Sequence, residues 1–489
     1  MIKIKFFFLF LFILFFNVSI SFSSNSAYNN NTLKARELIF DFKFTQAEKL
    51  LEKDKTPISF YLKTYSIFLQ NLLISGEENQ ELFNNSFDKT EDIIDDLDDD
   101  DKNKKLLLSE IFLQSAIIKL MNKDFVSGSI HFVKSYGFLE DQIIKYPNYK
   151  ENKKLSGLYK IIAGITPDKG KKFLKMIGLE GDIISGYKEL NQYLIYTQQK
   201  QNIYIEAYSL NLLIHTFLKE NLDNENFKFH LVNKEKNSVN STVLFSNILK
   251  NYKFGESKDL QKNIILIKEK TDKEIPILYY FLGVSLTTEN KENAKNNLLR
   301  FISTNKNENF IKASYWQMAR IAVLSNNNEG FEKYRELTKT EGGTFTAADK
   351  QALNEAEETL KPNKILLKAR LLFDVGKYDL AYNLLKQNPD NYKSNEEKAE
   401  YLYRLGRIEY MRENYKNAKI YFARALKNYS NTEKYFIPYS ALELAYIYQK
   451  EKNIEKQKYY FNKALELNKS EYQNSIKQKA NSGLKQLTN

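Results

Sequence analysis

Apolar and polar positions follow a helical period over most of this chain, and short polar breaks divide the apolar stretches into pairs. The pattern is clearest in residues 401–426, YLYRLGRIEYMRENYKNAKIYFARAL, where apolar residues recur every three or four positions on both sides of a break. Gly406 and Ala418 lie twelve residues apart, and small side chains at this spacing let two antiparallel helices cross with close backbones. The stretch therefore predicts a helix-turn-helix unit.

The same spacing recurs along the chain. Twelve residues separate four further pairs, which are Ala35 and Ala47, Ala319 and Phe331, Ala369 and Ala381, and Ala445 and Gln457. Gly283 and Ala294 form a degraded pair, one residue short of this spacing. Since a single helix pair cannot bury its apolar face alone, consecutive pairs must stack. We therefore expect an all-α, superhelical repeat solenoid.

The 401–426 unit resembles the tetratricopeptide repeat. That family has a Leu-Gly pair in the first helix, then a small residue, an aromatic residue and an Ala-Leu pair in the second. The matching residues are Leu405-Gly406, Ala418, Phe422 and Ala425-Leu426. The resemblance implies a tetratricopeptide-type superhelix that has no chemistry of its own. Seventeen glycines and seven prolines in 489 residues also fit long helices joined by short turns.

The regular pairing is interrupted in residues 157–186, which hold six of the seventeen glycines. A phosphate-binding loop does not fit, because five residues separate Gly164 from Gly170 and Lys172 stands where Ser or Thr is required. Backbone amides around Gly178 and Gly181 are an alternative anion site. Helix caps and close helix crossings are the commoner reason for such glycines, and we favour them.

This central segment also resembles a second family, the tetratricopeptide repeat protein 39 and inclusion-body clearance family, over residues 112–217. The matching residues are Pro167, Ile177-Gly178, Gly181-Asp182 and Gly186. The resemblance implies an α-helical repeat protein without established catalytic residues. That family is intracellular, so its location does not transfer to this chain.

The repeat pattern and the composition divide the chain into six parts. We expect a signal peptide in residues 1–23, N-terminal helical repeats in 24–145, a Gly-rich central helical segment in 146–190, degenerate helical repeats in 191–340, a linker helix in 341–362 and a C-terminal tetratricopeptide domain in 363–489. Thr346 and Asp349 predict the start of the linker helix, since they stand at capping-box spacing.

The first residues have the features of an export signal. Lys3 and Lys5 precede an apolar run over residues 6–16, and small residues at alternate positions follow it. An uncleaved anchor over residues 2–22 is the alternative. Export to a bacterial periplasm or outer envelope is the location that we favour, with an extracellular location as the second reading. No later segment is long and apolar enough to predict a membrane span.

The formal net charge of +12 excludes few partners, because the basic residues are spread over the whole chain. No Lys/Arg block forms a nucleic-acid patch, so we expect no nucleic acid. Attraction to an anionic envelope surface is consistent with the charge, although a Lys-rich composition alone would also produce it. With no cysteine, the chain has no disulfide framework and no thiolate metal site.

The sequence predicts no catalytic, cofactor-binding or metal-binding residues. The three histidines do not fall at metal-ligand spacing. The acidic run in residues 91–101 is not a calcium loop, because Asp101 stands where Gly is needed and Leu107 where Glu is needed. We expect a protein that is not an enzyme. An enzyme with its site in the Gly-rich segment is a third, weaker hypothesis.

In the tetratricopeptide family, the first helices of the repeats line a concave groove that holds a peptide or a partner helix. Transferred to this sequence, the groove residues are Arg370, Phe373, Tyr403, Arg407, Tyr410, Tyr439, Leu442, Tyr446 and Gln449. Tyrosine and arginine are frequent in binding hot spots, but tyrosines at these positions also serve packing between repeats. Some members of the family bind a carboxylate with Lys, Asn and Arg at fixed groove positions. Such a carboxylate clamp is not predicted here, because the residues of this chain at those positions do not match.

Function follows from these patterns only as a hypothesis. We expect an exported, non-catalytic scaffold or adaptor that binds a protein or peptide in its groove. The alternative is a helical repeat protein that binds lipid or the envelope surface. It is motivated by the apolar Gly-rich centre and the positive charge.

Overall fold

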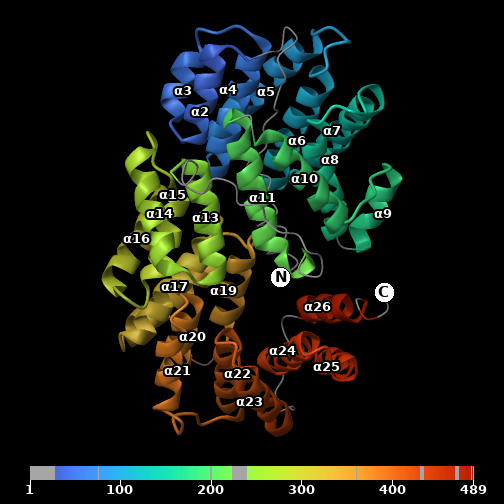
Figure 1. Ribbon diagram of the computed structural model, residues 1–489. Coiled ribbons are helices and arrows are strands. Elements are labelled where there is room, and N and C mark those ends of the chain that lie inside the picture. The colour runs from blue at the N-terminus through green and yellow to red at the C-terminus, as the bar shows by residue number, and fades with distance from the viewer. Residues whose placement is uncertain are drawn as a thin grey trace.

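A computed structural model describes residues 28–74, 76–166, 168–198, 201–222, 239–358, 361–429, 434–468, 473–485 and 487. Every regular element in these ranges is an α-helix, and the helices pack in sequence order as a curved stack of antiparallel pairs (Figure 1). The predicted all-α repeat solenoid is therefore confirmed. The predicted signal peptide lies outside the described residues. None of the described helices is long and apolar enough to cross a membrane.

The first half of the chain forms a row of helix pairs that closes on itself. Its helices are α2 (Asn30–Phe40), α3 (Phe44–Leu51), α4 (Pro57–Leu73), α5 (Glu77–Asp95), α6 (Lys104–Met121), α7 (Phe125–Lys145), α8 (Asn152–Ile165), α9 (Asp168–Met176), α10 (Ile183–Thr197) and α11 (Gln201–Leu222). Helix α11 packs on α10 and also contacts α2. The chain thus returns to its first described helix before the second half begins.

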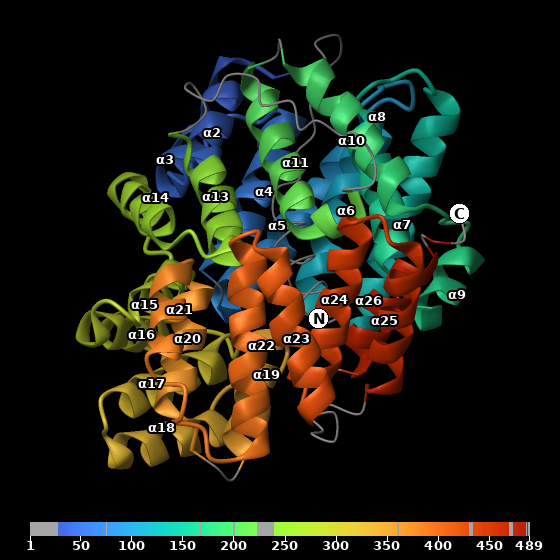
Figure 2. The ribbon, with the colours of Figure 1, turned by 60° about the horizontal axis from the view of Figure 1, so that its bottom comes forward.

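The second half continues the stack from α11 (Figure 2). Its helices are α13 (Ser241–Phe254), α14 (Ser257–Lys270), α15 (Pro276–Leu286), α16 (Lys291–Thr304), α17 (Ile311–Leu324), α18 (Asn328–Thr340), α19 (Ala347–Glu357), α20 (Lys364–Asp374), α21 (Tyr378–Lys386), α22 (Asn395–Met411), α23 (Tyr415–Tyr429), α24 (Phe436–Lys450), α25 (Ile454–Glu466) and α26 (Gln473–Lys485). Helix α19 adds a third member to the α17/α18 pair, and α26 covers the last pair, α24/α25.

The small residues of the repeat pattern lie where the paired helices meet. A Cβ atom on Gly406 would lie 2.6 Å from the Phe422 ring, so only glycine fits between α22 and α23. Gly283 is packed in the same way against Leu298 of α16. Ala418 and Ala294 are fully buried on the partner helices. The sequence pattern expected Ala418 opposite Gly406, whereas the side chain that Gly406 meets is Phe422, one turn further along α23.

The glycines of the central segment bring α8 and α10 together. A Cβ atom on Gly186 would lie 2.4 Å from the carbonyl oxygen of Gly157, and one on Gly164 would lie 2.6 Å from the backbone nitrogen of Ile183. Close helix crossing therefore accounts for these glycines, as the sequence analysis favoured. The domain boundary expected at residue 190 falls inside α10, because Gly186 makes α10 the partner of α8.

A buried charge cluster ties α2, α6, α8 and α11 together. Glu206 accepts hydrogen bonds from Arg36 and Lys154, each at 2.9 Å, and Lys154 also lies 2.6 Å from Glu110. The Tyr61 hydroxyl of α4 donates to Glu110 at 2.6 Å. All these side chains are almost fully buried. The cluster fixes the return of α11 to the first helices, because each buried charge needs its partners there.

Candidate functional site

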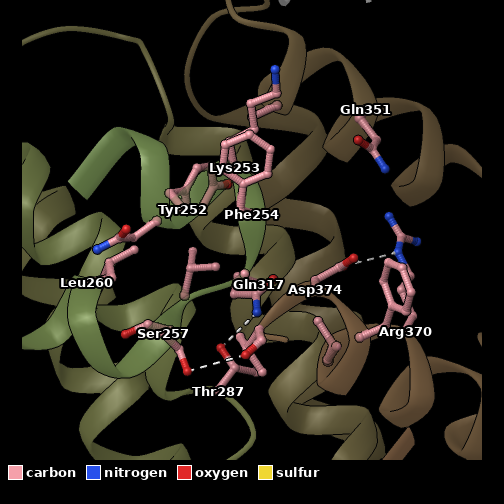
Figure 3. A pocket seen from close by; sticks show the side chains of 18 of the residues that line it. Tyr252, Lys253, Phe254, Ser257, Leu260, Thr287, Gln317, Gln351, Arg370 and Asp374 are labelled. Atoms are coloured by element: carbon pink, nitrogen blue, oxygen red, sulfur yellow. Dashed lines mark hydrogen bonds and ion pairs between the residues drawn. The ribbon is translucent and has the colours of Figure 1, made fainter. Parts of the chain in front are cut away.

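A cavity of about 770 Å³ lies where the helices α11, α13, α14, α15, α17 and α19 meet α20, α21, α22 and the end of α24, with the end of α8 beside them. Figure 3 shows it between Tyr252, Lys253 and Phe254 at the end of α13 and Arg370 with Asp374 on α20. The volume is within the range of protein sites that bind small ligands or inserted side chains. The cavity therefore joins segments that are far apart in the sequence.

Two left-handed turns fix this junction. Gly255 ends α13 with φ 74°, and Gly376 lies between α20 and α21 with φ 76°. A Cβ atom on Gly376 would lie 2.4 Å from the carbonyl oxygen of Gly255, so the two turns touch backbone to backbone. A salt bridge of 2.6 Å between Lys377 and Glu289 crosses the same junction. These contacts fix the end of α13 against the turn between α20 and α21, and so fix the cavity walls that these helices form.

Glu355 of α19 organises one wall of the cavity. It accepts hydrogen bonds from Arg320 at 2.7 Å and Arg370 at 2.9 Å, and from the Trp316 indole nitrogen at 2.8 Å. Burial alone would raise the pKa of Glu355, but the charges and hydrogen bonds of the two arginines outweigh it and hold this pKa well below its usual range. Glu355 is therefore ionised and neutralises part of the arginine charge.

Arg407 of α22 lies beside α20, the helix that carries Arg370, and has a different environment. Its guanidinium carbon lies 4.2 Å from the centre of the Phe373 ring and 5.8 Å from that of Tyr403, which positions it by cation–π contacts. Burial would lower the pKa of Arg407, but the nearby Tyr403, Glu443 and Asp374 raise it. The guanidinium thus lines the cavity with two carboxylates in its surroundings.

The cavity has an excess of positive charge and several aromatic rings. Its basic residues are Lys253, Arg320, Arg370, Arg407 and Lys450, whereas Asp374 is the acidic residue among those that line it. Its aromatic residues include Tyr252, Tyr280, Phe373, Tyr378 and Tyr410. An anionic group with an attached apolar or extended segment is the ligand chemistry that such walls fit.

The structure divides the predicted groove residues between two places. Arg370, Phe373, Arg407 and Tyr410 line the cavity. Tyr403 is buried beneath Arg407, with 3% of its surface exposed, so it supports that side chain from below rather than lining the groove.

The remaining predicted groove residues belong to α24 and do not line the cavity, which this helix reaches only with its last residue, Lys450. Leu442 is fully buried and belongs to the core, which corrects its placement in the groove. Tyr446 packs edge-on against Phe461 of α25, with ring centres 5.6 Å apart. The Tyr439 hydroxyl lies 3.2 Å from Ser475 of α26. Gln449 is on the same helix and does not line the cavity. Helix α26 thus occupies part of the surface that the repeat pattern assigned to a partner.

Sequence reasoning missed the contribution of the earlier helices. The cavity residues Tyr252, Lys253, Arg320 and Gln351 come from α13, α17 and α19, which carry degraded repeats or none. The Thr346 cap of α19 was predicted, and its side chain accepts a hydrogen bond from the Asp349 backbone. However, no local pattern indicated that Glu355 of this helix would face two arginines.

Within the described residues, no cluster of His, Asp or Glu side chains could hold a metal ion.

Comparison with known proteins adds little. No protein-family model matches the chain, and no curated protein matches it either. A solved structure described as "Circular tandem repeat protein with novel repeat topology and enhanced subunit contact surfaces" is similar at 12% sequence identity, over 94% of this chain and 87% of that chain, with a TM-score of 0.19. A similarity this low supports no functional transfer. The assignment as an all-α repeat solenoid rests on the arrangement of the helices themselves.

Proposed function

We propose that this chain is an exported, non-catalytic scaffold or adaptor of the tetratricopeptide class, which binds a protein or peptide segment in the cavity at the α19/α20 junction. Helical repeat stacks commonly present a concave surface to extended partners. The export signal and the repeat class rest on the sequence patterns described above. The proposal that it is not an enzyme rests on the absence of a recognisable catalytic motif in the sequence.

The observation that supports the proposal most is the position of Arg407. Its guanidinium is held on the Phe373 ring and faces a cavity that Arg370 and Tyr410 also line. Arginine and tyrosine contribute strongly to binding because they offer a large contact area together with polar groups. A guanidinium that is held by ring contacts and lines a cavity can form charge-assisted hydrogen bonds with a carboxylate from outside.

The charge of the cavity favours an acidic segment over a basic one. Glu355 neutralises part of the charge of Arg320 and Arg370, and Arg407 adds a further positive charge to the lining of the cavity. A partner with an Asp, a Glu or a terminal carboxylate at this place would gain charge-assisted hydrogen bonds. A basic segment would be repelled, so the charge makes the site selective for acidic segments.

Crosslinked co-purification from the native envelope fraction tests this proposal. The tagged chain is compared with Arg407→Gln and with a matched control, Arg424→Gln, whose arginine is exposed on α23 outside the cavity. We expect the parent and Arg424→Gln to retain the same protein partner and Arg407→Gln to lose it. Retention of that partner by all three proteins would contradict the proposal. Circular dichroism confirms that each variant is folded.

A further inference from the structure

Helix α9 is the least packed helix of the described chain. It connects α8 to α10 at the outer edge of the molecule and makes no extensive contact with any other helix among the described residues (Figure 1). Leu174 and Leu179 point inward and are 6% and 2% exposed. The Tyr136 hydroxyl of α7 donates to the Gly178 carbonyl at 3.3 Å, which fastens the end of the helix. The described helices leave the outward side of α9 uncovered.

Two large apolar side chains lie on that outward side. Met176 is 85% exposed and Phe173 is 41% exposed. They are three residues apart, so they lie one above the other on the same side of the helix. A helix normally buries such a stripe against a neighbour, because packing supplies most of its stability. The exposed stripe indicates a partner outside the chain.

Lysines border this stripe. Lys172 and Lys175 are exposed. On a helix with 3.6 residues per turn, they lie next to Met176, on the side of it that faces away from Phe173. Of the nearby acids, Asp182 caps α10 with a hydrogen bond of 2.9 Å, and Glu140 lies beside Tyr136 of its own helix and raises the pKa of that hydroxyl. Glu180 is the acidic residue of the following turn. The exposed side of α9 is thus apolar along one stripe and mainly cationic beside it.

We propose that α9 docks on an anionic lipid bilayer, with Phe173 and Met176 inserted among the lipid headgroups and Lys172 and Lys175 paired with lipid phosphates. Short helices with an apolar stripe beside lysines bind membrane interfaces in this way. The long lysine side chains can reach the phosphates while their methylene groups stay near the apolar boundary. This inference is independent of the cavity and adds a membrane surface to the proposed protein partner.

Vesicle co-sedimentation tests the inference. The chain without residues 1–23, which retains every described residue, is mixed with phosphatidylglycerol/phosphatidylcholine vesicles or with pure phosphatidylcholine vesicles at low ionic strength. We expect binding to the anionic vesicles alone, weakened by added salt because surface charges are screened. Equal binding to both vesicle types, or no binding to the anionic ones, would overturn the proposal.

Variants separate α9 from the general basic charge of the chain. Phe173→Gln with Met176→Gln should lower vesicle affinity at least tenfold. Lys172→Gln with Lys175→Gln should lower it about 30-fold, from the usual contribution of a lysine at an anionic surface. The matched control is Leu380→Gln with Ile454→Gln, which removes two apolar side chains that are 56% and 63% exposed on α21 and α25. Affinity that drops equally in the control would overturn the assignment to α9.

A spectroscopic readout follows insertion directly. The native Trp316 is buried, so Phe173→Trp adds a reporter at the surface. We expect its emission to shift to shorter wavelength with anionic vesicles, because the indole leaves water. Leu380→Trp should show no shift. Equal shifts of both variants, or no shift of Phe173→Trp, would overturn the proposed contact.

Discussion

Replacing Glu355 by glutamine removes the negative charge that Arg320 and Arg370 share behind the cavity. The two ion pairs measure 2.7 and 2.9 Å, and the side chains are 14–18% exposed. With charge centres about 4 Å apart and an effective dielectric constant of about 20, each pair contributes about 4 kcal/mol before desolvation. The neutral glutamine does not carry the desolvation cost of the buried Glu355 carboxylate, and this offsets several kcal/mol of the lost attraction. We therefore expect Glu355→Gln to lower the free energy of unfolding by about 3 kcal/mol.

Urea unfolding followed by tryptophan emission measures this loss. Trp316 is the single tryptophan of the chain and donates its indole N–H to Glu355, so its emission reports the unfolding of this region. A loss of about 3 kcal/mol lowers the urea midpoint by about 1–3 M. The matched control is Glu357→Gln, an exposed acid on the same helix, which should cost less than about 0.5 kcal/mol.

The pH dependence gives a second check on the same residue. Since the pKa of Glu355 in the folded chain lies below the unfolded value of 4.5, its contribution is present above that pH and lost as the pH falls through the folded pKa. The difference between parent and Glu355→Gln should therefore narrow in acid. A variant as stable as Glu357→Gln at pH 7 would refute the role of Glu355 as the shared counter-ion.

Three further predictions concern the scaffold. Gly186→Ala should destabilise the chain by about 1–3 kcal/mol, because its Cβ would overlap Gly157, whereas Gly137→Ala, with open space in α7, should stabilise it by about 0.5–1 kcal/mol; thermal unfolding compares the two. Burial raises the pKa of Glu206 to about 7, so its contribution to stability is full below pH 4.5 and is lost as the pH rises through about 7; Glu206→Gln should flatten this part of the stability profile measured by urea unfolding. Ser394→Ala removes the capping box of α22 and should cost about 1 kcal/mol by the same measurement, and a loss below about 0.2 kcal/mol would contradict it.

The helix pairs could be predicted from sequence because their contacts are local. The Gly406 and Phe422 contact joins two helices within one short stretch, so small and aromatic residues at fixed spacing reveal it. The glycines of the central segment were interpreted correctly for the same reason. The residues around Gly157 and Gly186 do not fit a phosphate-binding loop, so a close crossing of two helices was the explanation that we favoured for these glycines, and their contact confirms it.

The candidate site was only partly predictable because its walls come from distant segments. Arg370 and Arg407 are residues that the repeat pattern assigned to a groove and that line the cavity, but Arg320 and Glu355 lie on helices where that pattern is degraded or absent. Their ion pairs depend on how α17, α19 and α20 pack, and no spacing in the sequence encodes this. Tyr439 was assigned to a groove because the pattern could not show that α26 would pack beside it.

Site-specific photocrosslinking is the most direct test of the proposed binding cavity. A benzophenone amino acid replaces Met411, which lines the cavity and is 43% exposed, or Ile454, which is 63% exposed on α25 outside it. Both proteins are irradiated in the native envelope fraction, with and without Arg407→Gln. We expect a protein adduct at position 411 that Arg407→Gln abolishes and that position 454 does not form. The same adducts at both positions, or an adduct at 411 that is unaffected by Arg407→Gln, would contradict binding in the cavity.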